Sequence, residues 1–553
     1  MLVVALLLSS PFLFLGLGWG LPTRATDGFL FGERTPWTGK EIVELAGGWG
    51  GEGGKTVVGA DVQRDAAIDR STPVLLNGTD AQRADIVRRY RLYTYQPDEM
   101  INLRAFSQMR PGKLDLDPRL YQYGGLWFYP GGAALKVASL VGYVTLEPDV
   151  TYYLDRPEEV GRMYVVLRWM TAGWALVGVA AVYGLARQMG GHPVVAAVVG
   201  LAFASAPGVV VFSHEAKPHV PGMVLTLLAG WAAVGYVRKG GMWRLSATAG
   251  LAGAAFGMVV SMLPAALIPL TAIYMGRSKM QGVAGGAARS VVCAVLVFSG
   301  VYAVSNPYVV WHLATDRSLL GGQISNSTAM YRVSSPLGTV GGVFYMLVSL
   351  TPAVLLVLPT LYGIAVDVER LKKGEKGVYL PVGLLVMGPT VMAIVLMFAA
   401  LAAGKPGEFA RFGLVVGAMG VVCAGYLSTR FRMPMAIPLV VVGLHMVLSF
   451  PELARYLGDE GGATTRLESA ERMRGIGAEE VTVVAEPAPY NTPALDLWKT
   501  RMVLLPAGPG QKGTLGQPPD SDGVWRMSWA ARENFFRAGG LDRLGDSGKA
   551  LER

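Results

Sequence analysis

The chain has 553 residues, of which 52% are hydrophobic and only 16% are charged, and its mean hydropathy is positive. A soluble chain of this length would carry about 25% charged residues, so the composition favours repeated membrane-spanning helices over a soluble protein. The net charge of +9 comes from basic residues spread between apolar runs, which argues against nucleic acid as a partner. Cys293 and Cys423 lie inside apolar runs, so neither a disulfide framework nor a cysteine metal site is expected.

Apolar windows predict about eleven membrane-spanning helices and therefore an all-α polytopic membrane protein. The predicted spans cover residues 2–21, 164–185, 194–212, 220–237, 246–260, 262–275, 290–304, 342–366, 378–403, 414–427 and 434–450. A cleaved signal peptide would have basic residues before its apolar segment. No basic residue precedes the first span, so we expect this span to be retained.

Charges in the short loops predict the orientation of these spans. If the first span runs from inside to outside, the inside loops hold Arg187, Arg238, Lys239, Arg244, Arg277, Lys279, Arg289, Arg370, Lys372, Lys373, Lys376, Arg430 and Arg432. The short outside loops hold only Lys217, Arg317, Arg332, Lys405 and Arg411. This asymmetry follows the positive-inside rule and predicts a multi-pass protein of the plasma (inner) membrane, with Asp98 on the extracytoplasmic face.

The chain divides into four predicted parts: the first span at 1–21, an extracytoplasmic loop at 22–163, a transmembrane bundle at 164–450 and a soluble extracytoplasmic segment at 451–553. The loop contains predicted short helices at 83–91 and 99–108 and a glycine-rich stretch at 47–54. A helix at 468–474 and strands at 481–485 and 502–505 predict a small α/β tail.

One apolar segment, residues 121–144, is not counted as a span. Counting it would invert every later loop against the charge rule. We expect instead a juxtamembrane helix at the outer membrane surface. Its headgroup-level side chains would be Trp127, Tyr129 and Tyr143, with Lys136 on the polar side.

The sequence Gln96-Pro97-Asp98-Glu99 places two adjacent carboxylates just outside this bundle. Proline suits the first turn of a helix, so Asp98 and Glu99 are expected in the opening turn of the helix that follows. Acidic residues there also stabilise a helix through its dipole, which is the structural alternative to a catalytic role. The extracytoplasmic position, next to the juxtamembrane segment, favours chemistry.

Several motifs between residues 90 and 450 resemble the GT-C membrane glycosyltransferases, and in particular the bacterial aminoarabinose transferase and protein O-mannosyltransferase (dolichyl-phosphate-mannose-protein mannosyltransferase-like) group. They are Tyr95-Gln96-Pro97-Asp98-Glu99, Asp117-Pro118, the aromatic segment 121–130, Arg162, Ser213-His214-Glu215-Ala216-Lys217-Pro218-His219, Asn306-Pro307-Tyr308 and Glu408-Phe409-Ala410-Arg411-Phe412.

The resemblance implies an enzyme that takes a sugar from a polyprenyl phosphate or diphosphate and passes it to a glycan, lipid or protein acceptor outside the cytoplasm. An acid at the position of Asp98 would act as general base on the acceptor, with Glu99 beside it. Cationic side chains would steady the lipid phosphate. The candidates by sidedness are Arg104, Lys217, Arg332 and Arg411.

The chain departs from the family pattern at the second aspartate. His219 takes its place, and Glu215 offers a carboxylate four residues earlier. A histidine can act as a base or bind phosphate, so both residues remain catalytic candidates.

No cofactor is predicted with certainty, and a divalent metal is left open. His214 and His219 are five residues apart, which does not place two ligands on one helix face, and His312 would be the third ligand.

Two other functions remain open at this point. A transporter or flippase for a lipid-linked glycan would carry ionisable residues inside its spans, where this chain has mainly Arg168 and His445. A family member that has lost catalysis and acts as an envelope scaffold would also fit the loss of the second aspartate.

Overall fold

The structure is a computed structural model that describes residues 1–46, 74–96, 98–277, 286–318, 320–321, 336–375, 380–402, 410–431, 435–459, 467, 470–471, 474–475, 479–483, 494–504, 524–527 and 551–552. It forms two compact units. Unit 1 comprises Met1–Leu15, Leu120–Pro130 and Trp169–Leu453, and unit 2 comprises Gly16–Arg119, Gly131–Arg168 and Ala454–Arg553. Three helices, α7 (Gly125–Leu140), α9 (Pro157–Gln188) and α22 (Ala436–Gly458), contribute residues to both units.

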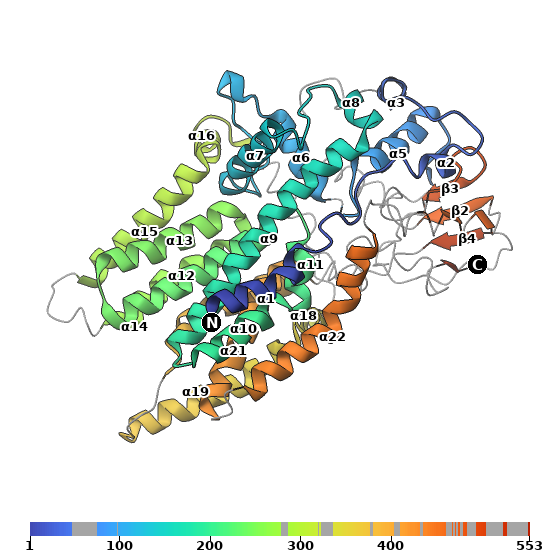
Figure 1. Cartoon of the computed structure of the whole chain (residues 1–553). Coiled ribbons are helices and arrows are strands. Elements are labelled where there is room, and N and C mark those ends of the chain that lie inside the picture. Colours follow the sequence, from blue (N-terminus) through green and yellow to red (C-terminus); the bar gives the residue numbers. More distant parts are fainter. Residues whose placement is uncertain are drawn as a thin grey trace. The chain divides into compact units, whose positions relative to one another are not determined.

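Unit 1 is a bundle of apolar helices, in which α12, α13 and α15 lie side by side (Figure 1). Besides parts of α7, α9 and α22, its helices are α1 (Leu2–Phe14), α10 (Pro193–Ala204), α11 (Pro207–Ser213), α12 (His219–Lys239), α13 (Met242–Met258), η2 (Val260–Ala266), α14 (Leu267–Gly276), α15 (Gly286–Ser305), α16 (Pro307–Thr315), α18 (Pro336–Leu350), η4 (Pro352–Leu356), α19 (Val357–Lys372), α20 (Val382–Ala402), η5 (Ala410–Gly413) and α21 (Leu414–Arg430).

Among the described residues, seven helices are long and apolar enough to cross a membrane, or up to eight if the bent pair α10 and α11 forms one span. Three shorter apolar helices lie at Leu2–Phe14, Val260–Gly276 and Val340–Leu350. These helices confirm the predicted all-α polytopic class, while the number of eleven spans stays a prediction.

The structure corrects the span predicted at 342–366, which consists of two helices. Helix α18 ends at Leu350, and η4 begins at Pro352 and continues into α19. Thr351 between them is extended, with φ −166° and ψ 126°. The residue before a proline is disfavoured in the helical region, which explains the break. Sequence hydropathy missed it because both sides of the break are apolar.

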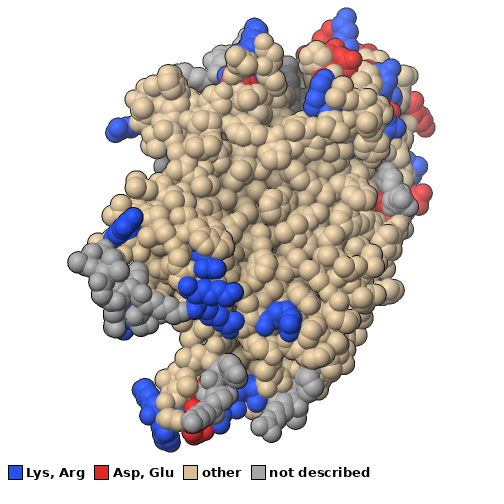
Figure 2. Space-filling view, turned by 60° about the vertical axis from the view of Figure 1, so that its left-hand side comes forward, with Lys and Arg blue, Asp and Glu red and all other residues tan. Residues whose placement is uncertain are grey.

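The predicted inside loops converge at one end of unit 1. The Arg238 guanidinium at the end of α12 donates to the Gln188 carbonyl at the end of α9. Arg430 at the end of α21 pairs with Asp367 near the end of α19, with 2.9 Å between Nε and Oδ1. On the face in Figure 2, Lys and Arg gather beside a broad area without charged side chains. This distribution agrees with the predicted orientation, which remains a prediction as to membrane and face.

Unit 2 combines the segment after α1 with the chain's C-terminal part. Its elements include α2 (Asp27–Leu30), α3 (Gly39–Ala46), α5 (Asp80–Leu92), α6 (Asp98–Gln108), η1 (Pro111–Lys113) and α8 (Val150–Asp155). Helices α5 and α6 confirm the two short helices predicted at 83–91 and 99–108. The glycine-rich stretch at 47–54 lies outside the described residues.

A five-stranded sheet in unit 2 has the order β1-β3-β2-β4-β5. The strands are β1 (Val74–Leu75), β2 (Glu480–Val483), β3 (Arg501–Leu504), β4 (Val524–Met527) and β5 (Leu551–Glu552). The central strands β3, β2 and β4 are parallel, and β1 and β5 pair antiparallel at the two edges. Strands β2 and β3 occur where the sequence predicts them, and the edge strand β1 from the N-terminal segment was not predicted. The α/β character of the tail stays a prediction.

The juxtamembrane segment forms helix α7, but one predicted feature is wrong. The Trp127 side chain is fully buried rather than placed at lipid headgroup level. The exposed apolar side chains lie at the C-terminal end of the helix, where Leu140 is 74% exposed and Val141, just after it, is 75% exposed. Tyr143 is 44% exposed, and Lys136 is exposed, as a surface helix requires. The bulky Trp127 ring therefore anchors the helix to the protein.

Candidate functional site

The two adjacent carboxylates of the motif differ in environment. Glu99 is fully buried in unit 2, and its two oxygens accept from Nε and Nη2 of Arg168 at 2.8 and 2.7 Å. The Thr94 hydroxyl donates to Glu99 Oε2 at 2.6 Å. This bidentate pair satisfies both carboxylate oxygens, which favours a positioning role for Glu99 over proton transfer.

Arg168 also holds the turn that follows α1. Its Nη1 donates to the carbonyl oxygens of Leu17 and Trp19 at 2.8 and 2.6 Å, and its guanidinium lies 4.7 Å from the Trp19 ring centre. Gly20 has a positive φ of 59°, and a Cβ there would meet the Tyr95 ring at 2.8 Å. Only glycine therefore fits this turn. An arginine within an apolar span is the sequence signal for a buried acidic partner, but that signal does not say which acid is the partner.

Asp98 is the first residue of α6 and is half-buried. Its place in the first turn confirms the helix start predicted from the sequence, and an acidic residue there stabilises the helix through its dipole. Arg104, on the same helix, is half-buried, and its side chain forms no ion pair with any residue that the structure describes. Unit 2 thus holds three of the predicted site residues on α6.

The second group of predicted site residues lies in unit 1, in the segment between α11 and α12. Glu215 and Lys217 form an ion pair, with 3.3 Å between Oε2 and Nζ, and each side chain is 2% exposed. The Lys217 amide also donates to the Glu215 carbonyl at 2.8 Å, which closes a tight turn. A buried lysine stays charged only beside a partner such as this carboxylate.

His219 opens helix α12 among aromatic rings. Its ring lies edge-to-face against Tyr123 and Phe412, with ring centres 5.7 and 5.6 Å apart. The side chain is only 2% exposed. Arg411, next to Phe412, is half-buried with its guanidinium 5.2 Å from the Phe412 ring centre. The structure therefore brings His219 and the Arg411-Phe412 motif together, as the predicted outside location requires.

Two backbone amides hold the segment at 121–125 in unit 1. The Gly124 amide donates to the Met258 carbonyl at 3.0 Å, and the Gly125 amide donates to Asn306 Oδ1 at 3.1 Å. A Cβ at Gly124 would lie 1.7 Å from the Gly257 carbonyl oxygen, so the close approach requires glycine. Asn306, noticed in the sequence only as part of a motif, thus serves to fix the aromatic segment.

The histidines do not form a metal centre. Both ring nitrogens of His214 lie 2.7 Å from backbone carbonyl oxygens, Nδ1 from Val210 and Nε2 from Leu15. His312 packs against Tyr121, with ring centres 5.5 Å apart. The described part of the chain contains no group of three or more His, Cys, Asp or Glu side chains that could hold a metal ion. The three candidate ligands are therefore not assembled in this structure.

Part of the predicted site lies outside the described residues, namely Arg332 and the Glu408-Phe409 start of the motif that ends at Phe412. The Asp115-Leu116-Asp117 triplet forms a loop, in which Asp117 accepts from the Arg119 amide at 2.9 Å and Asp115 pairs with the Arg119 guanidinium at 3.3 Å. These contacts give the triplet a structural role.

Comparisons with known proteins match neither a family model nor a curated protein sequence. Solved structures similar to this chain include ArnT from Cupriavidus metallidurans bound to undecaprenyl phosphate, with 13% identity, coverage of 78% of this chain and 84% of that one, and a TM-score of 0.40. The protein O-mannosyltransferase Pmt1-Pmt2 complex of S. cerevisiae, bound to its sugar donor, has 15% identity, coverage of 54% and 36%, and a TM-score of 0.30.

An oligosaccharyltransferase from Archaeoglobus fulgidus, in complex with Zn and sulfate, has 15% identity, coverage of 91% of this chain and 61% of that one, and a TM-score of 0.37. The chain thus spans less than two thirds of the O-mannosyltransferase and oligosaccharyltransferase chains that it matches.

Proposed function

We propose that this chain is an integral-membrane glycosyltransferase that moves a sugar from a polyprenyl-phosphate or diphosphate donor to an extracytoplasmic acceptor. Asp98 is the general base. The observation that carries the proposal is the contrast between two neighbouring carboxylates: Glu99 is fully buried against Arg168, whereas Asp98 is half-buried at the start of the same helix. Glu99 holds the helix through Arg168, whereas the Asp98 side chain is partly exposed.

The chemistry needs only one carboxylate. The acceptor group gives its proton to Asp98 as its oxygen or nitrogen bonds to the anomeric carbon of the sugar. The bond from that carbon to the phosphate oxygen breaks, and the lipid phosphate leaves with the electron pair. A cationic side chain stabilises the charge that develops on this phosphate. Lys217, which is buried and pairs with Glu215, is proposed for this role. Arg104 and Arg411 are the other described candidates.

His219 is proposed as a second polar group that orients donor or acceptor. Its buried position between Tyr123 and Phe412 fixes the ring, and rigid aromatic neighbours suit contact with a sugar or a lipid chain. Glu215, which is committed to Lys217, is proposed to tune that lysine rather than to accept a proton.

A transfer assay with the reconstituted protein and polyprenyl-phosphate sugars tests the proposal. Replacing Asp98→Asn removes the base without changing its shape, so kcat should fall about 10²- to 10⁴-fold. Asp115→Asn is the matched control, because Asp115 lies in the loop after α6, where it pairs with Arg119 and accepts the Asp117 amide. Its transfer rate should stay near wild type. Unchanged transfer in Asp98→Asn would refute the catalytic assignment.

The proposed location is the plasma membrane with the site outside. Tags at Lys372 and at the C-terminus should report opposite sides of the membrane, because Lys372 ends α19 at the basic end of unit 1. The same side for both tags would contradict the orientation.

A further inference from the structure

Helix α22 carries an unusual polar stripe. Most of its middle side chains are apolar and exposed toward the surroundings of the bundle, with Val447 72% and Phe450 69% exposed. His445 and Ser449, one helical turn apart, are fully buried. A polar side chain within a span is retained where it satisfies other polar groups. Their partners are two backbone carbonyls at a break between α10 and α11 and the Thr351 hydroxyl at a break between α18 and η4.

The first break separates α10 from α11, which are bent by 59°. Pro207 has no amide hydrogen, so the helical hydrogen bonds end there. The Ala206 amide bonds to the Phe203 carbonyl at 3.2 Å, not to the Ala202 carbonyl, which a continuous helix would use. His445 Nδ1 lies 2.8 Å from that Ala202 oxygen. The Ser449 hydroxyl donates to the Ser205 carbonyl at 2.7 Å.

The second break is the one between α18 and η4. Thr351 begins η4 by accepting the Ala353 amide on its hydroxyl oxygen at 3.1 Å. The same hydroxyl lies 2.7 Å from His445 Nε2. Because the Ala202 carbonyl can only accept, Nδ1 carries the proton, and Nε2 accepts from Thr351. One neutral imidazole thus joins both breaks.

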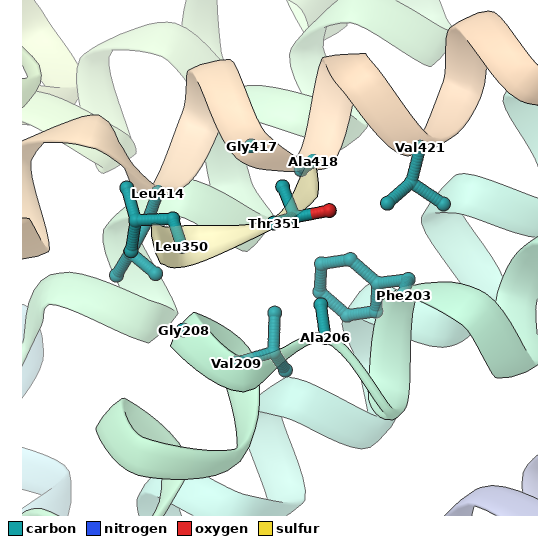
Figure 3. Close-up of a pocket in the computed structure, with 10 residues that line it drawn as sticks. All are labelled: Phe203, Ala206, Gly208, Val209, Leu350, Thr351, Leu414, Gly417, Ala418 and Val421. Carbon is teal, nitrogen blue, oxygen red and sulfur yellow. The ribbon is translucent and has the colours of Figure 1, made fainter. Parts of the chain in front are cut away.

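Packing alone does not hold this junction. A small apolar cavity lies where the breaks meet, lined by Ala206 and Val209 from the first break, Leu350 and Thr351 from the second, and Leu414 and Val421 from α21 (Figure 3). Figure 3 shows Thr351 between the α21 ribbon and the segment of the first break that carries Ala206 and Val209. Side chains around a void lose dispersion contacts, so the polar links contribute a larger share of the local stability.

The first break leads directly into the candidate site. Helix α11 spans one and a half to two turns, from Pro207 to Ser213, and the segment with Glu215, Lys217 and His219 follows it. Its far end is held by His214, whose ring contacts the Leu15 carbonyl oxygen at the end of α1. The orientation of this segment therefore depends on how α11 leaves the break.

We infer that Thr351, His445 and Ser449 are positioning residues for the segment that carries Glu215, Lys217 and His219. They satisfy the open backbone groups at both helix breaks, and so fix the direction of α11. This inference rests on the proposed function in one respect, the effect on transfer. The effect on the segment itself is independent of it.

The test compares single variants of the full-length protein in nanodiscs. Thr351→Val removes the hydroxyl that joins η4 to His445, and Thr351→Ser keeps it. Thr271→Val is the matched control, because the Thr271 hydroxyl bonds only the Leu267 carbonyl within its own helix α14. Ser449→Ala is paired with Ser349→Ala, whose hydroxyl bonds the Tyr345 carbonyl one turn earlier.

Two readouts separate the inference from the proposed function. Hydrogen exchange of the peptide at 213–222 needs no substrate, and it should quicken about tenfold in Thr351→Val and Ser449→Ala but not in Thr351→Ser or either control. The kcat of transfer should fall about tenfold in the same two variants, with the KM for the donor little changed.

Exchange at 213–222 that is equal in Thr351→Val and Thr271→Val would overturn the inference. A wild-type protein without transfer activity would refute the proposed function, and the exchange data would still decide the positioning role. In a third outcome, exchange quickens while kcat and KM keep their wild-type values. The three residues would then hold the segment without affecting transfer, and their role as positioning residues would be overturned.

Discussion

Two buried networks, one in each unit, solve the same problem, a polar group buried beside apolar helices, with opposite chemistry. In unit 2 the solution is charged: Glu99 and Arg168 form a fully buried bidentate pair. In unit 1 it is neutral: His445 links a threonine hydroxyl to a backbone carbonyl. A charged pair costs much desolvation and depends on both partners, whereas a neutral network loses less when one member is removed. The charged network adjoins the proposed base, and the neutral one lies within the spans.

The largest effect is expected from breaking the charged network. Arg168→Met leaves the Glu99 carboxylate buried without its bidentate partner and removes the donors to Leu17 and Trp19. We expect the free energy of unfolding to fall by about 3–5 kcal/mol, measured by thermal or chemical unfolding in detergent. The double variant Arg168→Met/Glu99→Leu should recover part of this loss, because it leaves no unpaired charge. A double variant that is less stable than Arg168→Met would contradict this explanation.

A smaller effect is expected from the neutral network. His445→Leu removes one hydrogen-bond partner each from the Ala202 carbonyl and the Thr351 hydroxyl, but it leaves no buried charge unpaired. The loss should be about 1–3 kcal/mol in the same unfolding measurement. Met446→Leu, a conservative change on the neighbouring half-exposed side chain, is the control and should stay near wild type. A loss for His445→Leu as large as for Arg168→Met would erase the proposed contrast.

Sequence patterns predicted the helices around both networks, but not the networks themselves. The positions of α5, α6 and most spans follow from local apolar and turn signals, and Asp98 begins its helix as Pro97 indicates. The partner of Arg168 could not be predicted, because the pairing with Glu99 joins residues 69 positions apart. The break at Thr351 was hidden within a continuous apolar run.

The site shows the same division between local and long-range information. The sequence places Glu215, Lys217 and His219 in one short segment, and the structure adds the ion pair between Glu215 and Lys217. It could not show that His219 meets Phe412, which lies in a distant motif. The sequence also could not show that Glu99 and Asp98 have different environments. That difference arises from the burial of Glu99 and from its partner Arg168 on another helix.

The smallest effect is expected where a charged pair is exposed. Lys373 and Glu369 approach to 2.8 Å at the end of α19, almost the 2.7 Å of Arg168 and Glu99, but their side chains are 66% and 65% exposed. Lys373→Ala should change the free energy of unfolding by about 0.5 kcal/mol or less, because water and salt screen the pair. Adding salt should remove even this difference, whereas the loss in Arg168→Met should persist at high salt. If the exposed and buried variants lost similar stability, the distance between charges, and not their burial, would set the energy, and the contrast between the two networks would lose its physical basis.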